Sequence, residues 1–192
     1  MKKRNKHTKE QLLEKGIELI TEHGYHGTGL KKILDTVEVP KGSFYNYFKS
    51  KEVFVSEIIR KYSQDILKKV DDYLENTDDD PITAIRNIHH VAIMKCGGAG
   101  GCLTGNLAAE IGTSVRSCQI AMNDAVELWK TRFVRLIKQG QKAGSVRKDL
   151  SGEVLADILW DIWQGGLLRL KIDGDVERLK TTIDNTLDIL FK

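Results

Sequence analysis

The chain has 192 residues, of which 41% are hydrophobic and 30% are charged, an ordinary balance for a globular protein. No apolar run approaches the ~18 residues that a membrane-spanning helix needs, and no apolar segment follows the basic N-terminal residues, so we expect neither a membrane span nor a secretory signal. The odd number of cysteines (Cys96, Cys102 and Cys118), without metal-type spacing, predicts free thiols and a cytoplasmic location.

Positive charge is concentrated at the N-terminal end. Residues 1–51 hold 11 Lys and Arg against 6 Asp and Glu, a net charge of +5, whereas the remainder carries −2. Binding to a polyphosphate requires such charge, because each phosphate contact releases condensed counterions. The asymmetry favours a nucleic-acid partner, although a basic segment can also be only a solvated tail.

Helix signals follow one another along the chain, and we find no strand alternation and no repeat. Thr8 starts a capping box and Gly24 stands where a C-terminal glycine cap belongs, so the first helix is predicted at about 9–23. Thr28 is the predicted cap of a short second helix that carries Leu30 to Val37. The remaining helices are predicted near 41–47, 51–74, 81–95, 103–110, 114–141, 152–172 and 175–191. Ser50 and Asp80 are the predicted caps of the helices at 51–74 and 81–95, Pro81 stands in the first turn of the latter, and the helix at 152–172 begins after Ser151.

Two short helices meet at Pro40, which fits the start of a helix and no deeper position. Phe44 and Phe48, four residues apart, supply the inward face of the second short helix. Tyr45 and Tyr47 stand ~200° apart around its axis, so at least one of them points outward. An outward tyrosine beside Lys and Asn suits contacts to phosphates and base edges. The arrangement is that of a helix-turn-helix, whose second helix enters the major groove.

The residues of this segment resemble the signature of the TetR family, G-Y…T…V-S-K-G-T-L-Y-x-H-F-x-x-K. The matching residues are Gly24-Tyr25, Thr28 and Val39-Pro40-Lys41-Gly42-Ser43-Phe44-Tyr45-Asn46-Tyr47-Phe48-Lys49-Ser50-Lys51-Glu52. Pro40 and Tyr47 replace the usual serine and histidine, and Glu38 stands where a small residue is common. The resemblance covers Thr8 to Phe54 and implies a homodimeric DNA-binding repressor.

The resemblance also implies DNA contacts at particular positions. Gly42 leaves room for a close approach of the backbone to DNA, and the segment Lys2 to Lys6 is either an arm along a groove or a solvated tail. Phosphate contacts are expected at Thr28, Lys31 and Lys51, base contacts at Lys41, Gly42 and Ser43, and contacts of either kind at Tyr45, Asn46 and Tyr47.

An all-α fold of about nine helices follows, with a three-helix DNA-binding domain at 1–50 and a helical ligand-sensing and dimerisation domain at 51–192. We expect the ligand pocket among the middle helices, although each candidate residue can also be plain core. Two adjacent histidines on a helix point ~100° apart, so we expect no metal and no cofactor. The candidates are His89, His90, Ile93, Cys102, Leu107, Met122, Trp129 and Phe133.

The last two predicted helices carry wide apolar stripes. The pair Gly165-Gly166 lies in the middle of the first of them, which indicates that something approaches closely there. The stripes are either intramolecular core or, as the TetR resemblance implies, a four-helix dimer interface, and a dimer suits a two-fold operator. The predicted interface residues are Leu155, Leu159, Trp163, Leu167, Leu179, Ile183 and Leu187.

The glycine-rich stretch from Cys96 to Gly101 is predicted to be a flexible loop that leads into a helix. A thiol at a helix N-terminus has a lowered pKa, which favours the reactive thiolate. The run from Gly101 to Glu110 resembles the G-C-L-x-x-x-L-A-x-E run of a TetR-like subgroup that includes electrophile and hypochlorite sensors. Cys102 occupies the place of the sensing cysteine in that run, and a small packing residue is the alternative interpretation.

The predicted function is therefore a repressor that leaves a palindromic DNA operator when a small-molecule effector binds or when Cys102 is modified. A ligand-independent regulator or activator is the alternative. An all-α enzyme is more remote, because the sequence has no paired carboxylates with suitable spacing, no nucleophile set and no P-loop lysine after its glycines.

Overall fold

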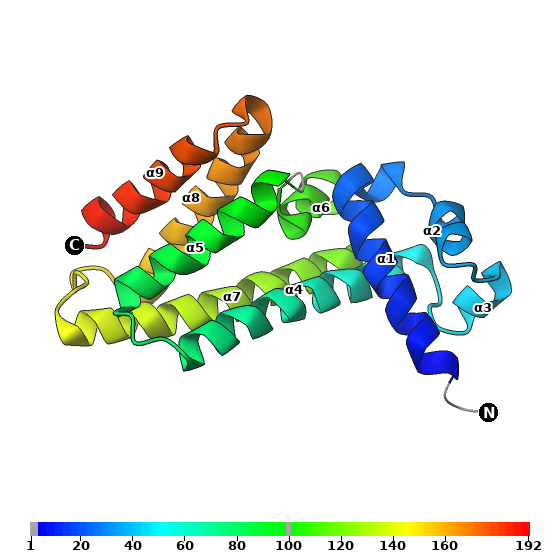
Figure 1. Cartoon of the computed structure of the whole chain (residues 1–192), viewed down its shortest axis with the longest axis horizontal. Helices are drawn as coiled ribbons and strands as arrows, with labels where there is room; N and C mark the ends of the chain where they lie inside the picture. The colour runs from blue at the N-terminus through cyan, green and yellow to red at the C-terminus, as the bar shows by residue number, and fades with distance from the viewer. Residues whose placement is uncertain (1–3, 99–100) are drawn as a thin grey trace. The chain divides into compact units, whose positions relative to one another are not determined.

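The computed structural model describes residues 4–98 and 101–192, and over these residues the chain forms α-helices and one turn of π-helix but no strand (Figure 1). The predicted all-α fold is confirmed. None of the described helices is both long and apolar enough to cross a membrane. The elements are α1 (Arg4–Gly27), α2 (Leu30–Thr36), α3 (Lys41–Tyr45), α4 (Lys51–Glu75), α5 (Pro81–Gly98), α6 (Leu103–Ile111), α7 (Arg116–Ala143), α8 (Gly152–Asp173), α9 (Val176–Asn185) and η1 (Thr186–Leu190).

The chain divides into two compact units. The first comprises Met1–Ile66 and Leu103–Ala125, and the second comprises Leu67–Cys102 and Val126–Lys192. Buried side chains of α4, α6 and α7 belong to the same core as those of α1 to α3. The predicted domain boundary after residue 50 therefore lies inside the first unit.

The start of the first unit differs from the prediction at two caps. α1 begins at Arg4, so Thr8 lies within the helix and the predicted capping box is wrong. Gly24 does interrupt the helical geometry of α1, with a φ of 73° that glycine adopts without strain. Gly29, and not Thr28, is the N-cap of α2.

Three phenylalanines hold α3 in place. Phe44 and Phe48 are buried as predicted, and their rings lie 5.2 Å apart. Phe54 of α4 packs edge-to-face on both, at 5.3 Å from Phe44 and 4.8 Å from Phe48. Aromatic rings in such arrangements add stability beyond that of area burial, so this cluster fixes the face that α3 turns toward its own core.

The predicted caps of α4, α5 and α8 are confirmed. Backbone N–H groups in the first turns donate to Ser50 Oγ at 3.3 Å, to Asp80 Oδ1 at 3.0 and 3.3 Å, and to Ser151 Oγ at 3.3 Å. Each side chain satisfies donors that a helix start leaves unpaired. Pro81 then occupies the first helical position of α5, as predicted.

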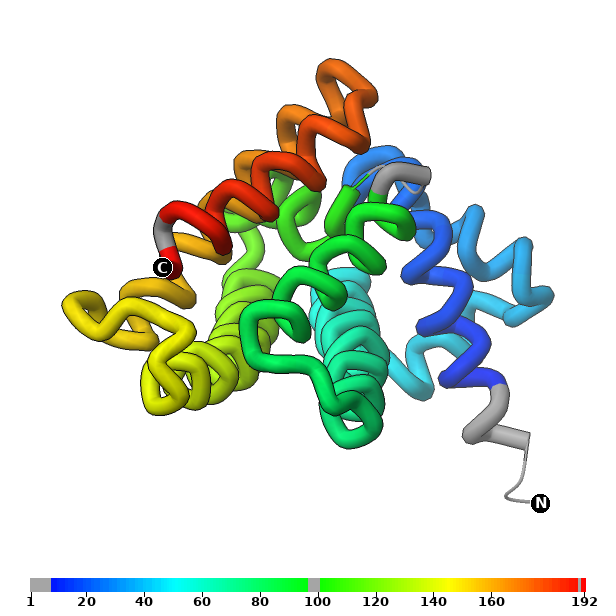
Figure 2. Tube along the Cα trace, turned by 60° about the vertical axis from the view of Figure 1, so that its left-hand side comes forward, coloured from blue at the N-terminus to red at the C-terminus, as the bar shows by residue number. Residues whose placement is uncertain are grey.

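In the second unit, α8 and α9 run side by side (Figures 1 and 2). A Cβ added at Gly166 would lie 2.4 Å from Leu179 Cδ1, so the close approach predicted from the glycine pair occurs there. The predicted helix at 175–191 is α9 followed by the π-helical turn η1.

Candidate nucleic-acid interface and ligand site

The outer side of α3 is polar and exposed. Lys41, Gly42, Tyr45 and Asn46 lie in solvent, and Tyr45 is 50% exposed. Lys31 of α2 is exposed as well. Ammonium groups, an amide and a tyrosine hydroxyl are the donors that proteins present to phosphates and base edges. In the part of the chain that the structure describes, this face has the composition of a DNA-reading surface.

Tyr45, the last residue of α3, and Tyr47, two residues further on, differ in burial. Tyr47 is half-buried and packs against the core of the first unit, whereas Tyr45 points away from it. The ring of Tyr45 meets the buried Phe44 edge-to-face at 5.3 Å. The geometric argument that at least one tyrosine faces outward is therefore confirmed, and Tyr45 is that residue.

Two predicted phosphate contacts are already engaged within the protein. Thr28 is fully buried, and its hydroxyl donates to the carbonyl of Leu19 at 3.1 Å. Lys51 donates to the carbonyl of Tyr25 at 2.7 Å and lies 4.0 Å from the centre of its ring. Burial lowers the pKa of Lys51. These side chains join α1 to its neighbours, so a phosphate contact from either would compete with a contact inside the protein. Lys2 and Lys3 of the predicted arm lie outside the described residues.

The turn before α3 contains a feature that sequence reasoning missed. Glu38 has a φ of 53°, in the left-handed region that side chains other than glycine, asparagine and aspartate seldom adopt. The backbone N–H of Val39 donates to the carbonyl of Leu34 at 3.0 Å and closes the turn. The available signal was the TetR preference for a small residue at this position.

Glu110 is a second missed residue. Its carboxylate accepts the backbone N–H of His26 at 3.1 Å, next to the break that Gly24 makes in α1. The end of α6 is thereby tied to the chain that leads into α2. The signal was the glutamate at the end of the Gly101–Glu110 run.

In the second unit, His89 is only 2% exposed, and aromatic rings surround it. The ring centres of Phe133 and Trp163 lie 5.3 Å away and that of Trp129 6.0 Å away. Burial lowers the pKa of His89 to about 4, so the imidazole is neutral at pH 7. Its Nδ1 lies 2.8 Å from the carbonyl of Ile85.

The structure separates the eight predicted ligand residues. His89, Ile93, Trp129 and Phe133 lie in or against the core of the second unit. Leu107 and Met122 belong to the core of the first. His90 is 2.9 Å from Asp184, which also pairs with Arg86. The predicted residues therefore divide between the cores of the two units.

The predicted loop around the cysteines is shorter than expected, because α5 extends to Gly98; Ala99 and Gly100 lie outside the described residues. Cys102 is half-buried, directly precedes α6 and packs against the core of the second unit. Burial, reinforced by the neighbouring Cys102, raises the pKa of the Cys96 thiol to about 11, so Cys96 remains protonated at neutral pH.

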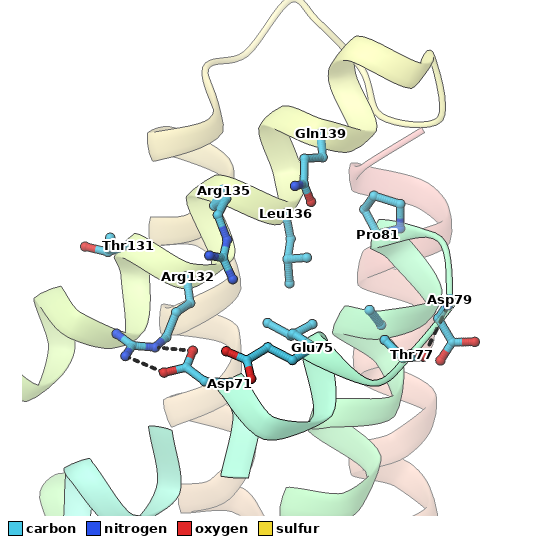
Figure 3. Close-up of a pocket in the computed structure, with 12 residues that line it drawn as sticks. Asp71, Glu75, Thr77, Asp79, Pro81, Thr131, Arg132, Arg135, Leu136 and Gln139 are labelled. Carbon is cyan, nitrogen blue, oxygen red and sulfur yellow. Dashed lines mark hydrogen bonds and ion pairs between the residues drawn. The ribbon is translucent and has the colours of Figure 1, made fainter. Parts of the chain in front are cut away.

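A cavity of about 750 Å³ lies elsewhere in the second unit, and none of the predicted ligand residues lines it (Figure 3). Arg132 and Arg135 project from α7 toward Asp71 and Glu75 at the end of α4. Arg132 forms two hydrogen bonds with Asp71, at 2.9 and 2.7 Å. This charged, ion-paired wall differs from the mostly apolar lining that small-molecule sites favour.

The predicted dimer residues are all buried within a single chain. They pack in the core between α8 and its neighbours, as the core interpretation of the stripes predicts, and they leave little or no surface for a partner. The opposite side of α8 is exposed and mixes apolar residues with the carboxylates of Asp157 and Asp161; Leu168 is 64% and Ile172 81% exposed there. Val154 and Gly165 lie on the same side at helical spacing.

The fold and the polar face of α3 define a class: an all-helical regulator with an N-terminal helix-turn-helix. The profile described as "Bacterial regulatory proteins, tetR family" matches residues 12–58, and the profile "Tetracyclin repressor-like, C-terminal domain" matches residues 82–185. The chain therefore belongs to the TetR family, and as a member it is a DNA-binding transcriptional repressor.

Individual relatives agree with this membership. The chain is 34% identical to the HTH-type transcriptional repressor DhaR of Mycobacterium sp. (strain GP1), over 96% of this chain and 90% of that protein. It is 31% identical to the repressor NemR of Escherichia coli K12, over 97% of both chains. The crystal structure of the reduced form of E. coli NemR has a TM-score of 0.87 at 26% identity, covering 95% of this chain and 96% of that one.

Proposed function

We propose that two copies of the chain bind a palindromic operator and are released by a small-molecule effector or by modification of Cys102. The observation that carries the DNA-binding part is the exposed face of α3, with Lys41, Tyr45 and Asn46 outward and Phe44 buried beneath them. A recognition helix needs an apolar side that packs on the protein and an opposite side whose polar groups face the DNA. Such a repressor acts in the cytoplasm.

The exposed side of α8 supports a homodimer. Large apolar side chains exposed together on one helix face are candidates for an interaction site. Leu168 and Ile172 are the most exposed large apolar residues of α8, and a Cβ placed on Gly165 would meet nothing from the rest of the described chain within 4 Å. A second copy can therefore approach α8 closely at that glycine, and a two-fold pair suits a palindromic operator.

Release is a population shift between a DNA-competent state and another state. Repression weakens only as far as the effector binds the two states differently. The aromatic surroundings of His89 support a small-molecule effector. The position of Cys102, directly before α6, supports the covalent route. In that route the thiol adds to a ring carbon of a quinone: the C–S bond forms as a ring C=C π bond breaks, and the thiol proton and the displaced ring proton end on the two quinone oxygens.

A gel shift with the DNA upstream of the chain's own gene tests the proposal. Wild-type protein is expected to bind at low salt and to release after treatment with benzoquinone, whereas Cys102→Ser binds equally well and stays bound. Cys96→Ser is the matched control and is expected to release like the wild type. If the wild type stays on DNA under benzoquinone, the covalent route fails and reversible ligand binding remains. If no protein binds that DNA or any genomic fragment, the proposal fails as a whole.

A further inference from the structure

The ring of His89 has one nitrogen that no protein group satisfies. Nδ1 lies 2.8 Å from the carbonyl oxygen of Ile85, and because a carbonyl can only accept, Nδ1 carries the proton. Nε2 is buried and has no hydrogen-bond partner among the described residues. Burial keeps the imidazole neutral, so Nε2 presents a bare lone pair. A buried acceptor left unsatisfied is costly, and such groups call for an explanation.

The ring contacts of His89 are all aromatic. Trp129, Phe133 and Trp163 meet its ring edge-to-face, and Trp160 continues the cluster at 5.0 Å from Trp129. Ile93, one helical turn beyond His89 on α5, is fully buried. A trapped water needs two to four polar partners, and of these side chains each tryptophan offers one indole N–H donor and no acceptor. An organic group that brings its own apolar surface suits the lining better.

We propose that His89 Nε2 is the hydrogen-bond acceptor of the effector site, and that the effector is an uncharged molecule with an apolar, aromatic body and one O–H or N–H donor. A carboxylate is disfavoured, because its oxygens would face the lone pair of Nε2 and its charge would be buried among aromatic rings. An ether of the same shape fits the rings but leaves Nε2 unsatisfied. This inference rests on the proposed ligand-released repressor and names the chemical class of its ligand.

The tryptophans provide a direct readout. The chain has three tryptophans, and all three, Trp129, Trp160 and Trp163, belong to this cluster. Intrinsic tryptophan fluorescence of the intact protein, without DNA, therefore reports on this site alone. The probes are 4-ethylphenol, its methyl ether 4-ethylanisole and the anion 4-ethylbenzoate.

We expect wild-type protein to bind 4-ethylphenol about tenfold more tightly than 4-ethylanisole, as one buried hydrogen bond allows, and to bind 4-ethylbenzoate most weakly. His89→Phe keeps an aromatic ring but lacks the acceptor, so the phenol and the ether should bind it equally. His90→Gln, which alters the neighbouring histidine that faces Asp184, should keep the tenfold preference. Equal binding of phenol and ether by the wild type, tighter binding of the benzoate, or no binding of any probe would overturn the inference.

A measurement on the wild type alone guards against a variant that fails to fold. In ¹⁵N spectra of histidine-labelled protein, Nε2 of His89 should be unprotonated at pH 7, and its resonance should move when 4-ethylphenol is added. A proton on Nε2 would contradict the assignment. Gel shifts separate the two proposals. If 4-ethylphenol binds through His89 but does not release the DNA, the ligand site stands and ligand-controlled repression is refuted. If 4-ethylphenol releases DNA from His89→Phe, ligand-controlled repression stands and the role of His89 is refuted.

Discussion

At the residue scale, Tyr45 is half-exposed, and its ring packs on the buried ring of Phe44. Tyr45→Ala should weaken operator binding by ~1–3 kcal/mol, because the side chain is half-exposed on the proposed DNA-reading face and packs only in part against the protein. Filter binding or gel shift measures the affinity, and thermal unfolding should be nearly unchanged. Tyr45→Phe separates the hydroxyl from the ring. Unaltered operator affinity of Tyr45→Ala would remove this residue from the interface.

His89 makes stability depend on pH. The pKa of His89 is about 4 in the folded chain, against 6.5 for an ordinary histidine, so between these values the unfolded chain binds a proton that the folded chain excludes. Stability therefore rises with pH through this window, and the contribution present above pH 6.5 is lost as pH falls toward 4, by up to ~3 kcal/mol.

Chemical denaturation of the wild type and of His89→Phe at pH 7 and pH 4.5 isolates this contribution, since the other titrating groups are shared. The wild type should lose more stability than the variant on acidification. Equal losses would show that His89 is not buried in its neutral form.

At the element scale, the turn between α2 and α3 contains strain at Glu38. A left-handed conformation costs a side chain ~1–2 kcal/mol, whereas glycine adopts it freely at an entropic cost of ~0.5–1 kcal/mol. Glu38→Gly should therefore raise the free energy of unfolding by up to about 1 kcal/mol, and Glu38→Val should lower it. Urea unfolding measures both, and a loss of stability in Glu38→Gly would argue against the left-handed turn.

Two glycines of the first unit should respond in opposite ways to alanine. Gly24 has a positive φ, and an added Cβ would meet Glu110 Oε1 at 2.2 Å, so Gly24→Ala should cost ~1–3 kcal/mol of stability. A Cβ at Gly42 meets no atom within 4 Å. Gly42→Ala should therefore keep or slightly raise the melting temperature, yet weaken operator binding about tenfold if DNA approaches that backbone. Full operator affinity in Gly42→Ala would exclude the close approach.

Elements were predictable where a local signal governs them. The predicted helix starts are observed at four residues, because a cap depends only on neighbours within one helical turn. These residues are Ser50, Asp80, Pro81 and Ser151. Thr8 also satisfied the local rule but was wrong, since α1 continues past it to Arg4. A capping motif indicates where a helix can start, but it does not show whether the residues before it are helical as well.

At the scale of the whole molecule, the sequence left open which face of α8 is core. Both sides carry apolar residues, and the wider stripe with Leu155 and Leu159 was assigned to the dimer. In the structure that stripe packs within the chain, and the sparser one with Leu168 and Ile172 is exposed. Periodicity identifies faces, but only the packing of distant helices decides what covers each. The same reason explains why the partners of Thr28 and Lys51 inside the protein could not be predicted: Leu19 and Tyr25 meet them only in the folded chain.

The central claim is that two copies of the chain, joined through the exposed side of α8, read DNA with α3. The most direct test is the mass of the complex with a DNA fragment selected from genomic DNA, measured together with its footprint. We predict two chains on a two-fold site whose halves lie about one helical turn, ~34 Å, apart.

Leu168→Glu should abolish that complex and leave monomers, whereas Met94→Glu, at an equally exposed position on α5, should form it normally. One chain on a site without symmetry, or equal behaviour of the two variants, would contradict the account.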